Sequence, residues 1–368
     1  MSPADVLDRY ALNRALFERQ SLLRPAGHTA LQAVERLVGM QAQAPLAPYV
    51  GLWTRLRDFR PDDLAGLITG RQVVRIALMR GTIHLVTAAD CRTLRPLLQP
   101  LLDRALRSGA GRRLTGLDLH AIAAAGRELV DERPRTFGEL GAALTERWPG
   151  HAPADLAHVI RALVPLVQVP PRGLWGHGGQ ATHTSAETWL GGRLDPAPAL
   201  DDLVLRYLAG YGPATPRDIQ VWSGLTRLRE VVDGLRPRLR VFHDEHGNEV
   251  FDLPDAPRPD PGTPAPPRFL PEYDNLLRSH ADRTRVLPGG HRDRLATPND
   301  SPRPAFLVDG FVHGTWKLTR ARGTATLTIE PFASLPDPGA VTAEAARLLE
   351  FAAAGDTHDI KIAEVTAG

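Results

Sequence analysis

The chain is organised around one short stretch, Met40-Gln41-Ala42-Gln43-Ala44-Pro45. Two glutamines stand two residues apart at the predicted exit of an amphipathic helix. That helix is expected to begin at Thr29, where Gln32 completes a weak capping-box pattern. Its apolar residues recur at helical spacing and form one stripe: Leu31, Val34, Leu37 and Val38. Gln41 continues the stripe, so its amide is expected to point where the apolar neighbours point.

The relative direction of the two amides depends on where this helix ends. On an ideal helix of about 3.6 residues per turn, Gln43 lies roughly 200° round from Gln41. Pro45 disfavours the helical conformation at Ala44, and an extended exit places both glutamines on one side of the chain. Two interpretations follow. The amides either satisfy stray backbone groups at a helix terminus, or converge as a functional pair.

Helical and strand-like segments follow one order in the first part of the chain. Helices are predicted over residues 11–23, from Thr29, over residues 49–59 and from Pro61. Two strands over residues 73–86 then flank a tight turn near Arg80-Gly81. Several helices followed by a β-hairpin is the order of a winged helix.

The same order returns twice. Residues 90–108 and 114–132 are predicted to be linking helices; further helices are predicted from Thr136 and over residues 154–164, and a second wing begins at Leu166. In the third unit, Thr215-Pro216-Arg217-Asp218 starts a helix and Ser223-Gly224 makes the turn. A second helix over residues 226–235 carries Arg227 and Arg229, and a hairpin turns at residues 244–248. The units do not match residue by residue, so the repeat is one of architecture.

We therefore predict an α+β fold of three tandem winged helix-turn-helix units followed by a small β-rich module with a C-terminal helix. The predicted limits of the winged helices are residues 1–108, 109–198 and 199–255. The last module covers residues 256–368 and begins with a proline-dense linker.

Composition restricts the class of protein. The 368 residues are 43% hydrophobic and 23% charged, which is typical of a globular protein. Neither a bilayer-spanning run nor a signal-peptide layout is apparent, so no membrane role and a cytoplasmic location are expected. Cys91 is the single cysteine, which excludes an internal disulfide.

The cations are almost all arginine, because lysine occurs only at positions 317 and 361. Arginine suits phosphates and base edges, although a GC-rich genome produces the same bias. The candidate DNA-binding residues lie on the predicted hairpins, the predicted recognition helix and the last module: Arg75, Arg80, His84, Arg227, Arg229, Arg278, Lys317 and Arg320. For each alone, a solvated surface charge is the simpler explanation, whereas phosphate contacts are expected of the group.

No other motif indicates a cofactor. Phosphate-binding loops and dinucleotide fingerprints are missing, and the histidines satisfy no metal-ligand spacing, so neither a metal nor a cofactor is expected. Glu272, Asp274 and Asp282 cluster in sequence. They are either acid–base carboxylates or members of a structural network with the neighbouring arginines.

Five segments together resemble the tandem winged-helix DNA glycosylases of the AlkZ and YcaQ type: residues 12–14, 37–45, 79–86, 172–176 and 270–277. The resemblance covers nearly the whole chain. It implies that a glutamine–hydrophobic–glutamine motif is catalytic, and this motif falls on Gln41, Ala42 and Gln43. The YcaQ-like branch has an aspartate as the second member, so Gln43 indicates the AlkZ-like branch.

The resemblance implies a monofunctional glycosylase that removes bulky N7-alkylguanine adducts, and possibly interstrand crosslinks, as self-resistance to a DNA-alkylating natural product. Double-stranded DNA carrying alkylated guanine is then the partner, and a monomer the expected state. Two alternatives remain at this level. One is a non-catalytic winged-helix transcriptional regulator, and the other is a protein that sequesters the free drug.

Overall fold

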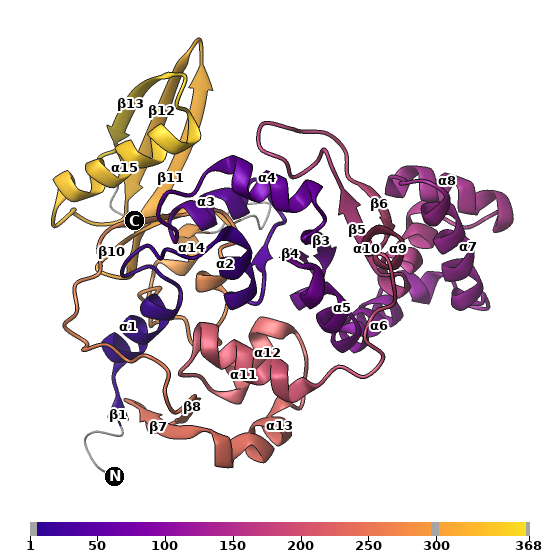
Figure 1. The fold of residues 1–368 in the computed structure, drawn as a ribbon, viewed down its shortest axis with the longest axis horizontal. Helices are drawn as coiled ribbons and strands as arrows, with labels where there is room; N and C mark the ends of the chain where they lie inside the picture. The colour runs from indigo at the N-terminus through magenta and orange to yellow at the C-terminus, as the bar shows by residue number, and fades with distance from the viewer. Residues whose placement is uncertain (1–5, 296–301, 366–368) are drawn as a thin grey trace.

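The computed structural model describes residues 6–295 and 302–365. It is an α+β protein, as predicted, in which one helical lobe stands apart from a larger body (Figure 1). The lobe contains α7 (Leu119–Glu132), α8 (Phe137–Arg147) and α9 (Pro153–Leu163). Within the described part of the chain, no helix is both long and apolar enough to cross a bilayer.

The first segment contains the elements that carry the glutamines. They are α1 (Arg9–Arg19), α2 (Ala30–Arg36), β2 (Met40–Gln41), α3 (Ala47–Trp53), α4 (Pro61–Thr69), β3 (Val73–Ala77) and β4 (Ile83–Thr87). The predicted capping box of Thr29 and Gln32 is confirmed at the start of α2. A short 3₁₀ turn, Met79–Gly81, joins β3 to β4.

The helix from Thr29 ends earlier than its apolar stripe through Val38 indicates. Helix α2 ends at Arg36, and the next backbone turns are left-handed, with φ of 51° at Val38 and 91° at Gly39. This conformation stops the helix. Gln41 therefore lies in a strand.

The two following segments also combine helices with a hairpin. The second adds α5 (Ala88–Leu97), α6 (Gln99–Ser108), β5 (Leu166–Val169), β6 (Thr182–Ser185) and α10 (Ala186–Leu190) to the lobe helices. The third contains α11 (Leu200–Tyr211), α12 (Pro216–Ser223), α13 (Leu228–Leu235), β7 (Arg240–Asp244) and β8 (Glu249–Asp252). Arg227 precedes α13 as its N-cap, in a left-handed conformation, and does not lie within the helix as predicted.

The C-terminal module is β-rich and contains the expected helix, but this helix does not close the module, because a further strand, β13 (Thr357–Ile362), follows it. The other elements of the module are β9 (Arg268–Leu270), α14 (Arg292–Leu295), β10 (Ala305–Val308), β11 (Phe311–Ala321), β12 (Thr324–Pro331) and the helix itself, α15 (Pro338–Ala352). Strands β11 and β12 form a long antiparallel hairpin that projects from the body in Figure 1.

The sheets join segments that are far apart in sequence. The first and second hairpins form one antiparallel sheet of order β2-β4-β3-β5-β6, in which Arg75 of β3 pairs with Gln168 of β5. Strand β1 (Val6–Leu7) pairs in parallel with β7. The predicted limits of the units therefore mark segments of sequence that share sheets, and they stay a prediction.

The apolar core follows the same division. The lobe has its own core, which includes the fully buried Leu140, Leu144 and Ile160. A second group joins α1 and α11–α13 to the central sheet and to residues 270–295, and a third joins α2–α4 to the C-terminal module. The central sheet, which carries Gln41, thus lies between two apolar groups.

Gly39 tests the importance of the left-handed exit from α2. A Cβ there would lie 2.5 Å from Val86 Cγ1, at a positive φ. We expect Gly39→Ala to lower the free energy of unfolding by about 2–4 kcal/mol, measured by urea denaturation. The matched control is Gly66→Ala within α4, where nothing lies within 4 Å of the added Cβ. The control is expected to raise stability by about 0.5–1 kcal/mol. Equal stability of Gly39→Ala and the parent protein would contradict this account.

Candidate active site

Gln41 is held at the edge of the central sheet. It pairs with His84 of β4, and only 5% of its surface is exposed. Because side chains alternate across a strand, its neighbours Met40 and Ala42 point to the opposite face, where both are buried in the core group of α2–α4. The strand thus separates the Gln41 amide from this apolar group.

Arg80 fixes the orientation of that amide. Its Nη2 donates to Gln41 Oε1 at 2.6 Å, and its Nη1 donates to the carbonyl oxygen of Trp222 at 2.6 Å. A guanidinium has only donors, so the atom that faces it must be the amide oxygen. Burial, together with the charges of Arg278 and Arg283, lowers the pKa of Arg80 to about 10. The side chain therefore stays charged at neutral pH.

Asn275 joins this arrangement from the C-terminal module. Its Nδ2 donates to the carbonyl oxygen of Gly39 at 3.2 Å, and its Oδ1 accepts from Arg80 Nη2 at 3.4 Å. The preceding Asp274 accepts two hydrogen bonds of 2.8 Å from the buried Arg55. This carboxylate is therefore engaged in a structural ion pair, although its partner is Arg55 and not one of the neighbouring arginines that the structural interpretation named.

A small cavity inside the protein adjoins Gln41. It measures about 10 Å³, room for about one water molecule. Its polar lining comes from Gln20, Gln41, Arg55, Tyr211, Asp274 and Asn275. All of these groups except Gln41 bond to one another or to backbone carbonyls, which makes the support behind Gln41 rigid.

Gln43 is exposed and lies beyond the end of β2. Its Oε1 accepts a hydrogen bond from the Ile83 N–H at 3.3 Å. In a regular strand pair, a backbone carbonyl oxygen would be the acceptor for this N–H. The carbonyl of Ala42 instead accepts from Arg75 Nη2 at 2.9 Å. Both glutamines thus direct their amide oxygens to the segment 80–83, and among the described residues the Gln43 NH₂ group has no partner.

Two of the predicted DNA-binding residues lie inside the protein. Arg75 is 3% exposed and binds the carbonyl oxygens of Ala42 and Arg172. His84 is fully buried, and its Nδ1 lies 3.1 Å from the carbonyl oxygen of Thr82. Neither side chain reaches the surface in this arrangement. Both side chains therefore contact other parts of the protein in this structure.

The other predicted DNA-binding residues are exposed or partly exposed but are spread over the body. Arg227 and Arg229 lie at the start of α13, whereas Lys317 and Arg320 lie on β11. Arg320 forms an ion pair with Asp356. Arg278 lies near Arg80, to judge from the effect of its charge on the pKa of Arg80. The structure therefore brings Arg80 and Arg278 to the glutamines and leaves the other four elsewhere.

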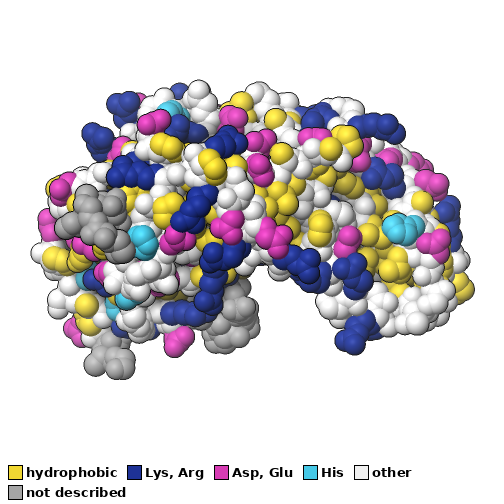
Figure 2. Space-filling model, turned by 90° about the horizontal axis from the view of Figure 1, so that it is seen from below, with side chains coloured by type: hydrophobic (Ala, Val, Ile, Leu, Met, Phe, Trp, Pro, Cys, Tyr) yellow, Lys and Arg dark blue, Asp and Glu magenta, His cyan; other side chains and the backbone are white. Residues whose placement is uncertain are grey.

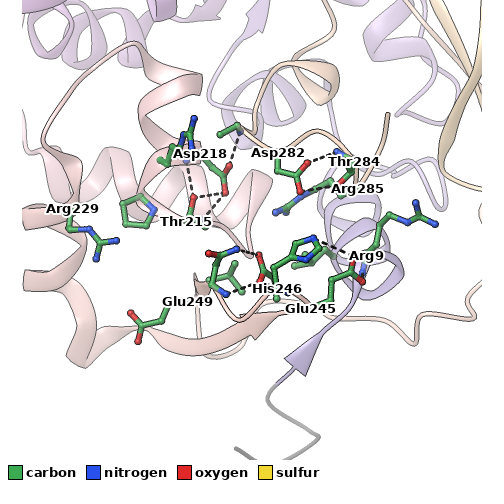
Figure 3. A pocket seen from close by; sticks show the side chains of 17 residues that line it. Arg9, Thr215, Asp218, Arg229, Glu245, His246, Glu249, Asp282, Thr284 and Arg285 are labelled. Atoms are coloured by element: carbon green, nitrogen blue, oxygen red, sulfur yellow. Dashed lines mark hydrogen bonds and ion pairs between the residues drawn. The ribbon is translucent and has the colours of Figure 1, made fainter. Parts of the chain in front are cut away.

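A larger pocket of about 470 Å³ lies between the start of α12, the β7–β8 hairpin and residues 281–285 (Figure 3). Arginines and carboxylates alternate in its lining, and Asp218 and Asp282 bond to neighbouring threonines. It contains Arg229 but neither glutamine. Because its lining carries four arginines and five carboxylates, an anionic DNA strand would meet charges of both signs there, and the pocket is a weaker candidate than the Gln41 site.

The molecule is hollowed between the lobe and the body. Figure 2 shows this concavity, with Lys and Arg side chains gathered along both of its margins. A concave surface with cationic margins attracts a polyanion such as DNA.

His84 makes the stability of this region dependent on pH. Burial and the charge of Arg80 lower the pKa of His84 from 6.5 to about 3. Unfolded His84 takes up a proton near pH 6.5 and folded His84 does not, so the free energy of unfolding falls as the pH is lowered from about 6.5 towards 3. At pH 5 we expect a loss of about 2 kcal/mol from this residue.

Urea unfolding at pH 7.5 and pH 5 measures this loss. A His84→Asn variant serves as the control, because it lacks the titrating group and should show a correspondingly smaller difference between the two pH values. An equal pH dependence in the variant and the parent would show that His84 is not held neutral.

Comparison with known proteins agrees with the architecture. The family model described as "DNA glycosylase AlkZ-like" matches residues 34–351. Among solved structures, the fold is similar to that of Streptomyces sahachiroi DNA glycosylase AlkZ, with a TM-score of 0.77 and 20% sequence identity over 96% of this chain and 99% of that chain. No curated protein sequence matches. The matched region includes Gln41, Arg80 and Asn275, and the chain belongs to the AlkZ-like DNA glycosylase family.

Proposed function

We propose that this protein is a monofunctional DNA glycosylase that hydrolyses the N-glycosidic bond of N7-alkylguanine, with Gln41 and Gln43 positioning the water. Membership of the family supports the reaction class. The observation that carries the residue assignment is the Arg80 hydrogen bond, which holds the Gln41 amide in one orientation beside the exposed Gln43.

The chemistry requires little of the protein beyond positioning. Alkylation at N7 makes guanine cationic and therefore a good leaving group, so a strong carboxylate base is less necessary. An amide oxygen has two lone pairs, one of which is taken in each glutamine by Arg80 or Ile83. The second lone pair of each oxygen can accept a hydrogen of the water. Orientation of this kind contributes up to about 7–11 kcal/mol in favourable systems.

Water is the nucleophile in this proposal. The two lysines, Lys317 and Lys361, are both exposed on strands of the C-terminal module, outside the Gln41 site. The proposed product is therefore an intact strand with an abasic site.

The substrate is proposed to be double-stranded DNA with a bulky N7-alkylguanine, including an interstrand crosslink. The protein is proposed to act as a cytoplasmic monomer in self-resistance to a natural product that alkylates DNA. The open concavity of Figure 2 supports a substrate that stays largely in the duplex, because a crosslinked guanine cannot swing freely into a closed pocket.

The glutamine pair is tested by the double variant Gln41→Ala, Gln43→Ala. We expect the single-turnover rate of base release from a duplex containing N7-methylguanine to fall by about 10²–10⁴-fold, because a loss of about 3–5 kcal/mol is part of what orientation of the water contributes. DNA affinity, measured by fluorescence anisotropy, should change little. Released base is measured by mass spectrometry, and the strand should break only after alkaline treatment.

The matched control is Gln32→Glu on the surface of α2, since glutamate also fills that position of the capping box. It should release base at the parent rate. Release at the parent rate by the double variant would disprove the assignment of the glutamines. Tight DNA binding by the parent without any base release would favour the regulator instead.

A further inference from the structure

Three arginines of the C-terminal module surround an open pocket that the reaction proposed above does not use. Arg278, Arg283 and Arg292 line this pocket, which measures about 310 Å³. Arg278 also lies over the ring of Tyr273, 5.9 Å from its centroid. The side chains come from two turns and from α14, so they meet only in the folded chain.

The charges of this cluster are not compensated among the residues that the structure describes. Throughout residues 6–295 and 302–365, the three guanidiniums form neither an ion pair nor a hydrogen bond. The other charged residues of the lining are largely engaged, because Asp274 pairs with Arg55 and Arg303 with Glu330. Among the described residues of the lining, only Asp293 remains to offset three positive charges. A guanidinium offers five N–H donors, so the pocket presents many donors without acceptors.

The arginines also repel one another. The charges of Arg278 and Arg292, together with burial, lower the pKa of Arg283. The charges of Arg278 and Arg283 act in the same direction on Arg80. Four cations are therefore close together, an arrangement that an anion of matching geometry relieves.

The cluster adjoins the Gln41 site through two links. The charges of Arg278 and Arg283 contribute to the lowered pKa of Arg80, and Arg80 is hydrogen-bonded to Gln41. Asp274 lines the pocket, and the adjacent Asn275 contacts Arg80. An anion in the pocket would lie beside the glutamines.

We propose that Arg278, Arg283 and Arg292 bind the backbone phosphate that flanks the target nucleotide. This inference rests on the proposed function, since it places the damaged strand at Gln41. Cleavage of a glycosidic bond builds positive charge on the sugar, and four uncompensated arginines beside it would oppose that charge. A bound phosphate removes this opposition and fixes the strand, as phosphate contacts generally do.

Charge-neutral linkages test the proposal without requiring catalysis. The probe is a duplex with a tetrahydrofuran abasic analogue at one position and a methylphosphonate at one of three linkages on either side. We expect the parent protein to lose about tenfold in affinity at one linkage, the effect of one charge-assisted contact. In the variant Arg278→Gln, Arg283→Gln, that linkage should no longer matter. The slope of log affinity against log salt should also fall by about 0.9.

The control is Arg24→Gln, which makes one of the same arginine-to-glutamine changes at a side chain that is 83% exposed and lies outside the pocket. It should keep the linkage effect of the parent. The double variant is expected to fold, because its guanidiniums form no internal hydrogen bonds to lose, and circular dichroism checks this. The proposal would be overturned if a methylphosphonate at the same linkage lowered the affinity of the double variant as much as that of the parent protein.

A second arm separates a DNA phosphate from free phosphate. Calorimetry with inorganic phosphate alone should show no saturable binding that depends on Arg278 and Arg283. Such binding, together with equal affinities at all linkages, would overturn the proposal in favour of a free-anion site. The failure of the proposed function can be told apart from the failure of the phosphate site. Linkage-specific binding without base release would contradict the glycosylase proposal. Base release without linkage-specific binding would contradict only the proposed phosphate site.

Discussion

One buried guanidinium connects the parts of the protein that meet at the candidate active site. Arg80 binds the side chain of Gln41, the backbone of α12 at Trp222 and the side chain of Asn275. The indole of Trp222 is itself fully buried against Tyr207 and Tyr211, so the carbonyl that Arg80 contacts is held firmly. Burying this charge is unfavourable, which its lowered pKa reflects. The hydrogen bonds offset that cost only if the segments that carry Gln41, Trp222 and Asn275 are all in place.

The backbone delivers Gln41 to this guanidinium by an abrupt change of direction. Left-handed residues at Val38 and Gly39 end α2 and start β2, and Asn275 holds the Gly39 carbonyl. Gln43 then continues the ladder of β4 through its side chain. The same region concentrates positive charge from Arg80, Arg278 and Arg283. An anionic DNA strand is the natural complement of such a site.

Much of the local structure was predictable from sequence because its causes are local. The capping box at Thr29, the helix start at Thr215, the strands on either side of Arg80 and the last helix all follow from short patterns. The end of α2 was missed because the apolar stripe keeps its helical period beyond the point where the backbone leaves the helix. The pairing of β3 with β5, and of β1 with β7, depends on contacts between distant segments that no short pattern encodes.

The contacts of the candidate site were also beyond prediction from short sequence patterns. The glutamine motif and Arg80 were identified as candidates, but their hydrogen bond spans 39 residues and the Arg80–Asn275 contact spans 195. Alternation along the hairpin could not show that Arg75 and His84 are buried, since β5 of the second hairpin pairs with β3 and β2 pairs with β4, and both pairings depend on distant segments. The role of Asn275 was likewise hidden, although it lies within a segment that carries the family resemblance.

The central claim is that Arg80 assists the reaction by orienting Gln41. A double-mutant cycle with Arg80→Lys and Gln41→Ala, measured as single-turnover release of N7-methylguanine, tests it most directly. Lysine keeps the charge but loses the planar fork, so we expect Arg80→Lys to slow release about 10–100-fold in the parent and to have almost no effect when Gln41 is already alanine. Equal slowing by Arg80→Lys in both backgrounds would show that Arg80 acts independently of Gln41 and would contradict the account.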